Sequence, residues 1–310
     1  MIQLSRFVFA AFATLAALSG LPAAVAQESP IGPAPLATSP VFRSWMSPEV
    51  VPAWNRGYTG KGSRLIFVDD FTSNARFYGN LGFGTGLKRH GEWTRWEGSL
   101  IAPGAADVTK DFRSGTAVTL GTGLNVINLS YGMYAASNYS INQIRWSAQE
   151  SSIISYAGGR AIIAKAAGND SINVGGVNSK GQRDYLNIGL IGRPSAVFVG
   201  ALTTNGTTTA PARLATYSNT AGSNTTVQKQ FLVVGVESNK TGLAGTSFAA
   251  PIVAGYAAII GNKFPSATPT QITNQLLTTA RKDTLLNFNA AIYGRGEASL
   301  TRALAPISIK

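Results

Sequence analysis

Three residue types that together can cleave an acyl bond occur along the chain in the order Asp, His, Ser. Asp69 directly follows the apolar run 65–68, His90 is the only histidine, and Ser247 follows a Gly-Thr turn. A serine hydroxyl needs a neighbouring base to become a nucleophile, and a neutral imidazole whose tautomer is held by a buried carboxylate suits that role. A lone histidine is more often a packing or surface residue, so the hypothesis depends on elements that bring these three residues together.

The strongest local signal is the stretch 245–255, Gly-Thr-Ser-Phe-Ala-Ala-Pro-Ile-Val-Ala-Gly. Its small residues predict a tightly packed helix, whose positive N-terminal end would favour negative charge near the Ser247 oxygen. Pro251 is compatible with the first turn, because the amides there have no intrahelical partner. On its own, Ser247 could instead be an ordinary N-cap residue. A Gly-x-Ser-x-Gly nucleophile elbow is excluded, because Ala249 stands at its last position.

The elements around these residues predict an α/β fold with a doubly wound, mainly parallel β-sheet and helices on both faces. Short apolar runs without polar alternation are typical of strands that are covered on both faces. They span residues 65–68, 125–129, 161–165, 196–199 and 231–234. Helices are expected at 141–158, 247–261 and 269–282, the last opened by a Thr-Pro-Thr-Gln capping box, whereas 202–230 should be surface loops. Active residues of such sheets lie at the carboxyl ends of the strands.

The stretch 245–255 resembles the serine motif of the subtilisin-like serine proteases, the subtilases. Other segments resemble further blocks of that family in the same order, from about residue 45 to 306, and Asp, His, Ser is the subtilisin order. These segments are 53–62, 65–70, 90–91, 101–105, 126–132, 166–169, 212–219, 293–296 and 303–304. The resemblance therefore implies a subtilisin-like fold and a secreted serine endopeptidase.

The resemblance also implies roles for individual residues. Ser247 would be the nucleophile, His90 the general base and then acid, and Asp69 the residue that orients His90. The Asn169 amide, with the backbone N–H of Ser247, would stabilise the oxyanion. Asp70 is expected to be a turn cap or a solvated loop carboxylate, and the alternative is an acidic wall that favours basic substrate side chains.

Substrate-binding residues follow from the same resemblance. Ser130, Tyr131 and Gly132 would present a strand edge to an extended peptide through main-chain hydrogen bonds. Ala167 and Gly168 would line the pocket for the side chain before the scissile bond, and their small size predicts broad specificity.

The segment after His90 departs from the family pattern, which continues as His-Gly-Thr-His-Val-Ala-Gly. Here Glu92-Trp93-Thr94-Arg95-Trp96-Glu97 follows Gly91. We expect the helix that anchors His90 to be abbreviated, with two Trp rings supplying its packing. This departure motivates an alternative function, a catalytically degenerate subtilase-fold binding protein, and the same covalent chemistry would also allow an acyl-transferring or peptide-ligating relative.

Composition and the first residues predict export. The 310 residues are 45% hydrophobic and 13% charged, which excludes disorder driven by charge and also a coiled coil. Residues 1–26 resemble a secretory signal peptide, with Arg6, an apolar stretch at 7–18 and Ala-Val-Ala at 24–26, too short for a transmembrane span. The signal peptide would be followed by a Pro/Ala/Ser-rich linker at 27–44, a peptidase domain at 45–306 and a C-terminal tail at 307–310. The protein is then secreted to the periplasm or the extracellular space.

The net charge of +12 favours electrostatic association with an anionic cell envelope. The basic residues are spread singly along the chain, so no specific nucleic-acid binding is expected. The expected partners are polypeptide substrates, and the protein is expected to be a monomer. The chain has no Cys, which excludes disulfides and thiolate catalysis. No cofactor is expected: structural calcium is possible by family resemblance, but no clustered carboxylate loop is present in the sequence.

Overall fold

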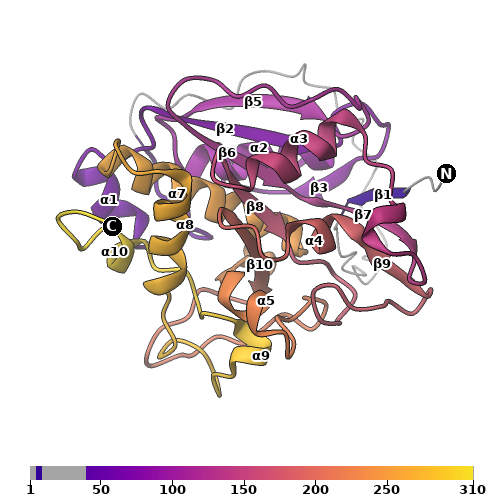
Figure 1. Ribbon diagram of the computed structural model, residues 1–310. Coiled ribbons are helices and arrows are strands. Elements are labelled where there is room, and N and C mark those ends of the chain that lie inside the picture. The colour runs from indigo at the N-terminus through magenta and orange to yellow at the C-terminus, as the bar shows by residue number, and fades with distance from the viewer. Residues whose placement is uncertain (1–4, 9–39, 310) are drawn as a thin grey trace, which may run out of the picture.

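A six-stranded parallel sheet forms the centre of the fold in the computed structural model, which describes residues 5–8 and 40–309 (Figure 1). The strand order is β11-β10-β8-β6-β2-β5. The strands are β2 (Ser63–Asp69), β5 (Ala106–Asp111), β6 (Leu124–Leu129), β8 (Ile162–Ala166), β10 (Ala196–Leu202) and β11 (Phe231–Gly235). The five strands expected from apolar runs are confirmed. The sixth, β5, is an edge strand without a fully buried residue, so it has no apolar run to reveal it.

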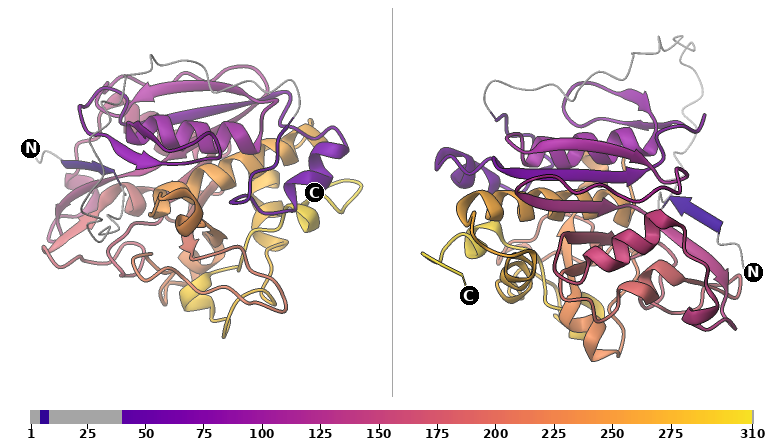
Figure 2. Two further views of the ribbon diagram at one scale, coloured as in Figure 1. Left: turned by 180° about the vertical axis from the view of Figure 1, so that it is seen from behind. Right: turned by 45° about the horizontal axis from the view of Figure 1, so that its top comes forward.

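Helices cover both faces of this sheet, which confirms the doubly wound α/β class (Figures 1 and 2). One face packs against α1 (Val50–Asn55), α2 (His90–Ile101), α7 (Ala250–Lys263), α8 (Pro269–Thr278) and α10 (Leu300–Ala303). The other packs against α3 (Ala148–Tyr156), α4 (Tyr185–Leu190), α5 (Thr225–Gln230) and α9 (Ala290–Tyr293). Short α6 (Ser238–Thr241) follows β11.

Several predicted helix boundaries were wrong. The region 141–158 is a 3-10 turn, Ile141–Gln143, followed by a separate helix α3, because Ser147 begins a new helix by accepting the Gln149 N–H. The helix opened by the Thr268 capping box ends at Thr278 rather than 282, where Thr278 and Thr279 hydroxyls bond carbonyls one turn back. The loop region 202–230 contains α5, which is capped by Asn224.

A second sheet lies beside the carboxyl end of β6. It contains β1 (Ser5–Val8), β7 (Tyr131–Ala136) and β9 (Gln182–Asp184) in the order β1-β7-β9, with antiparallel pairing throughout. Figure 2 shows β1 along the outer edge of β7. A hairpin of β3 (Phe77–Gly79) and β4 (Gly86–Lys88) precedes α2.

The predicted signal peptide and linker lie outside the described residues, except for 5–8 and 40–44. Within residues 5–8 and 40–309, no helix combines the length and the hydropathy needed to cross a bilayer.

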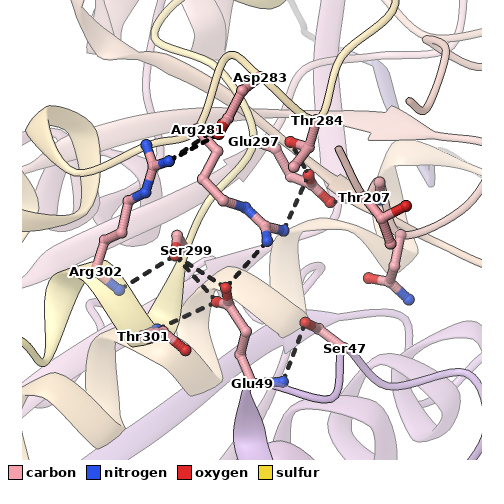
Figure 3. Close-up of polar contacts among 12 residues, drawn as sticks. Ser47, Glu49, Thr207, Arg281, Asp283, Thr284, Glu297, Ser299, Thr301 and Arg302 are labelled. Atoms are coloured by element: carbon pink, nitrogen blue, oxygen red, sulfur yellow. Dashed lines mark hydrogen bonds and ion pairs between the residues drawn. The ribbon is translucent and has the colours of Figure 1, made fainter. Parts of the chain in front are cut away.

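A largely buried polar network joins the start of the domain to its C-terminal part (Figure 3). The Arg281 guanidinium pairs with Glu49, which precedes α1, at 3.1 Å and with Glu297 at 3.0 Å. The Ser299 hydroxyl donates to Glu49 at 3.0 Å, and Ser299 also caps α10. Burial raises the pKa of Glu297, and the charge of Arg281 opposes this shift. One guanidinium therefore holds two carboxylates from distant parts of the sequence.

Candidate active site

Asp69 and His90 form a buried hydrogen-bonded pair at the carboxyl end of β2. His90 Nδ1 lies 2.6 Å from Asp69 Oδ1, and neither side chain is exposed. The Asp69 carboxylate also accepts the Thr94 hydroxyl at 3.0 Å and the Asp70 N–H at 2.7 Å. A proton on Nδ1 facing the carboxylate makes Nε2 the acceptor nitrogen, which is the tautomer that a general base needs.

The helix that carries His90 is a complete one, so the expected abbreviation was wrong. α2 has 12 residues, and at its start the Arg89 backbone N–H donates to the Glu92 carboxylate at 2.7 Å. Thr94 is one turn after His90, on the same face, and so reaches the same carboxylate. Trp93 is buried and donates its indole N–H to Phe77 O at 2.8 Å, so this ring does anchor the helix.

Ser247 lies in a 3-10 turn, Thr246–Phe248, directly before α7. The turn requires Gly245, whose φ of +141° is a conformation that side chains rarely allow. Ser247 is buried, and its Oγ donates to Ser130 O at 3.1 Å, while the Ser130 hydroxyl donates to Ser247 O at 2.9 Å. The serine is thereby tied to the end of β6.

The Ser247 hydroxyl is not hydrogen-bonded to His90 in this structure. His90 Nε2 is buried and has no hydrogen-bond partner among the described residues. The rings of His90 and Phe248 are neighbours, with centroids 5.5 Å apart, so the imidazole lies against the turn that carries Ser247. Hydrogen bonds between catalytic groups are often absent in a free enzyme and form only with substrate.

Asn169 is bound to the residue before Ser247. Its Oδ1 accepts both the N–H and the hydroxyl of Thr246 at 2.9 Å. The Thr246 hydroxyl also accepts the Gly168 N–H at 3.1 Å. Fixing the oxygen fixes the amide plane, and the Nδ2 group is then the donor end of the side chain.

The predicted substrate-binding residues lie on two adjoining elements. Ser130 precedes β7, Tyr131 and Gly132 begin it, and its outer edge carries β1. Ala167 and Gly168 follow β8, where Gly168 has φ +114° and a Cβ there would lie 2.3 Å from Asn219 Nδ2. Gly168 is therefore required by close packing.

Asp70 does not share the role of its neighbour. Its carboxylate accepts the Ser73 N–H at 3.0 Å and the Ser73 hydroxyl, and it lies 3.7 Å from the half-exposed Arg113 guanidinium. This is the geometry of a turn cap.

Three polar residues on the elements that carry the candidate site were missed by sequence reasoning. Thr94 and Thr246 position Asp69 and Asn169, and only the helical spacing of Thr94 from His90 could have indicated one of them. Glu97, on α2, is fully buried, and its two carboxylate oxygens have no hydrogen-bond partner among the described residues. Burial raises its pKa well above the usual value, so the side chain favours the neutral form.

The described residues contain no group of three or more His, Cys, Asp or Glu side chains that could hold a metal ion.

The fold and this constellation of residues define a class, the serine peptidases built on a parallel α/β sheet. The profile described as "Subtilase family" matches residues 106–296, which is more than half of the chain. The chain belongs to the subtilase family. The matched segment contains Asn169 and Ser247, whereas Asp69 and His90 precede it.

Solved structures of subtilisin-like proteases share the fold. A lanthipeptide protease matches with a TM-score of 0.52 and 15% identity, over 81% of this chain and 91% of that one. MycP3 protease from the type VII (ESX-3) secretion system matches with a TM-score of 0.51 and 17% identity, over 86% and 90%. Fervidolysin from Fervidobacterium pennivorans, a keratinolytic enzyme related to subtilisin, gives 0.51 and 18%, over 83% and 44%. No curated protein gave a significant match.

Proposed function

We propose that this subtilase is a secreted serine endopeptidase that hydrolyses polypeptides through a Ser247–His90–Asp69 triad and an acyl-enzyme intermediate. The observation that carries the proposal is the buried 2.6 Å bond between His90 Nδ1 and Asp69 Oδ1, beside the turn that carries Ser247. This pair presents an acceptor nitrogen in a site from which water is largely excluded.

Catalysis begins when the Ser247 side chain turns from Ser130 O toward His90 Nε2. Staggered rotamers of serine interconvert easily, and the bond to Ser130 O is one between neutral groups. His90 accepts the hydroxyl proton as Oγ attacks the substrate carbonyl carbon, and Asp69 stabilises the imidazolium that forms.

The negative charge that develops on the carbonyl oxygen needs donors that are already in place. Asn169 Nδ2 and the Ser247 backbone N–H supply them, with Asn169 held by its two bonds from Thr246. His90 then donates its proton to the leaving amine. In deacylation, His90 accepts a proton from water as the water oxygen attacks the acyl carbon, and it returns that proton to Ser247 Oγ as the carboxylic acid product leaves.

The substrate lies as an extended strand along the outer edge of β7, and Ala167 and Gly168 line the pocket beside it. Main-chain pairing of this kind is tolerant of sequence. Secretion rests on residues 1–26, and a monomer with an overall positive charge would associate with anionic surfaces.

A second candidate is the degenerate binding protein, which is favoured by the Ser247 Oγ bond to Ser130 O and the unpartnered His90 Nε2. A fluorophosphonate probe separates the two functions, because it reacts only with an activated serine. The peptidase predicts labelling that is lost in Ser247→Ala, together with cleavage of a quenched fluorescent casein. A folded protein that neither reacts with the probe nor cleaves casein would contradict the peptidase and favour the binding protein.

A further inference from the structure

We infer that Glu150 forms a subsite for the cationic side chain of Arg or Lys in a peptide bound along β7. The inference uses the proposed function only to identify the bond that is cleaved. The binding preference itself follows from contacts that the chain makes with its own residues.

Strand β1 shows how an extended peptide occupies this edge. Its residues pair antiparallel with β7, Ser5 with Tyr134, Arg6 with Met133, Phe7 with Gly132 and Val8 with Tyr131. Because β1 runs toward Ser130, a peptide in the same register places its next residue opposite Ser130. That position adjoins Ser247, since Ser130 O accepts the Ser247 hydroxyl. The peptide residue opposite Ser130 is the one whose carbonyl faces Ser247. The residue in the Arg6 position lies three residues before it in the peptide.

The Arg6 side chain occupies one face of this pairing. Directly paired residues of antiparallel strands place their side chains on the same face, so Arg6 shares a face with Met133, and alternation along β7 adds Tyr131. Both belong to the core on the α3 side of the central sheet. Arg6 Nη2 reaches Glu150 Oε2, on α3, at 3.2 Å.

Glu150 is well suited to hold a cation there. Its side chain is fully buried, and it accepts the hydroxyls of Tyr131, at 3.2 Å, and of Ser147. Both of these hydroxyl donors are neutral. Among the described residues, the charged group that pairs with the Glu150 carboxylate is the Arg6 guanidinium. A buried carboxylate is costly without a cationic partner.

Helix capping alone does not explain this carboxylate. Glu150 lies in the first turn of α3, where negative charge is favoured. However, the carboxylate is not confined to the helix end: one oxygen accepts the hydroxyl of the Ser147 cap, and the other accepts the Tyr131 hydroxyl of β7. The side chain thus serves the strand edge.

The test compares two fluorescein-labelled peptides, Ser-Arg-Ala-Val-Ala-Gly-Ser and the same peptide with citrulline, the neutral isostere of Arg. Binding is measured by fluorescence polarisation to the full-length precursor, which retains residues 1–26. It carries Ser247→Ala, which prevents cleavage, and Arg6→Gln, which weakens the internal competitor. We expect the Arg peptide to bind about tenfold more tightly than the citrulline peptide, the ratio that corresponds to about 1.4 kcal/mol.

Adding Glu150→Gln should bring the ratio of the two affinities to about one. The matched control is Asp170→Asn, which removes a carboxylate bonded to the other tyrosine of β7, Tyr134, but not to Arg6. It should leave the ratio near tenfold. Restoring Arg6 should weaken binding of both peptides, because the internal segment then competes better.

Three results would each overturn the inference. The Arg and citrulline peptides could bind with equal affinity to the chain that retains Glu150, neither peptide could bind, or the preference for the Arg peptide could survive Glu150→Gln. The first comparison does not depend on any Glu150 variant folding. A preference that is present in Ser247→Ala, with no cleavage by the chain that retains Ser247, would overturn the proposed peptidase and leave the subsite standing.

Discussion

Exchanging Asp69 for Asn tests the geometry of the proposed triad, because the two side chains have the same shape. Asp69 accepts three hydrogen bonds, from His90 Nδ1, the Thr94 hydroxyl and the Asp70 N–H. The amide of Asn has only one acceptor oxygen, so its NH₂ group must replace one oxygen of the carboxylate.

Both orientations of the amide harm catalysis. If the NH₂ group faces His90 Nδ1, the ring must accept there and carry its proton on Nε2, which can no longer take the serine proton. If it faces Thr94, the tautomer survives, but the imidazolium loses its buried counter-charge. We therefore expect kcat to fall by about 10⁴, the magnitude known for this exchange in serine peptidases, or about 5.5 kcal/mol of transition-state stabilisation.

The neighbouring Asp70 supplies a matched control. Asp70→Asn keeps the oxygen that accepts the Ser73 N–H and loses an ion pair with Arg113, which is 53% exposed and so contributes little. Its kcat should stay within about threefold. Hydrolysis of quenched casein is measured for both variants, and thermal unfolding checks that both are folded. Similar losses in the two variants, or a loss below about 10² in Asp69→Asn, would refute the reasoning.

Three further outcomes are expected. Asn169→Ala should lower kcat by about 10²–10³ with little change in KM, because its amide acts on the oxyanion; steady-state kinetics on one peptide decides this. Glu97→Met should raise the unfolding temperature, and more so as the pH rises. Because the pKa of Glu97 is raised in the native state, unfolding releases a proton above pH 4.5. The unfolding free energy of the unsubstituted protein therefore falls as the pH rises, by up to about 1.4 kcal/mol per pH unit, until the native pKa is passed. A pH-independent difference between the two proteins would show that Glu97 does not titrate in this way. Arg281→Ala should cost about 3 kcal/mol in urea unfolding, because it leaves two carboxylates without their cation, whereas Arg302→Ala, in an exposed pair, should cost less than about 1 kcal/mol.

The central strands of the sheet were predictable because both faces of the sheet are covered by helices, so each of these strands contains a short apolar run that stands out in the sequence. Sequence-based prediction failed for strands whose position depends on pairing with segments far away in the sequence. β5 is half-exposed at the sheet edge, and β7 pairs with two segments far away in the sequence, β1 and β9. Apart from the strand edge expected at residues 130–132, neither strand is distinguished by its own residues.

The histidine helix shows why a local pattern misled. The expected abbreviation rested on the departure of residues 92–97 from the family pattern that follows the histidine. In the structure, a Cβ on Gly98 would lie 2.8 Å from the Phe67 ring, so this glycine allows α2 to pack closely on β2. The residues of the proposed site were predictable from the resemblance to subtilases, but the Ser247 bond to Ser130 O was not, because it depends on a side-chain rotamer.

The central claim is that Ser247 leaves Ser130 O and is activated by His90. A crystal structure of the protein treated with a peptidyl phosphonate tests it most directly. The account predicts a covalent Ser247 Oγ–phosphorus bond, His90 Nε2 within hydrogen-bond distance of that oxygen, and a phosphonyl oxygen bound by Asn169 Nδ2. An unmodified Ser247 that still donates to Ser130 O, with the inhibitor bound intact or absent, would contradict it.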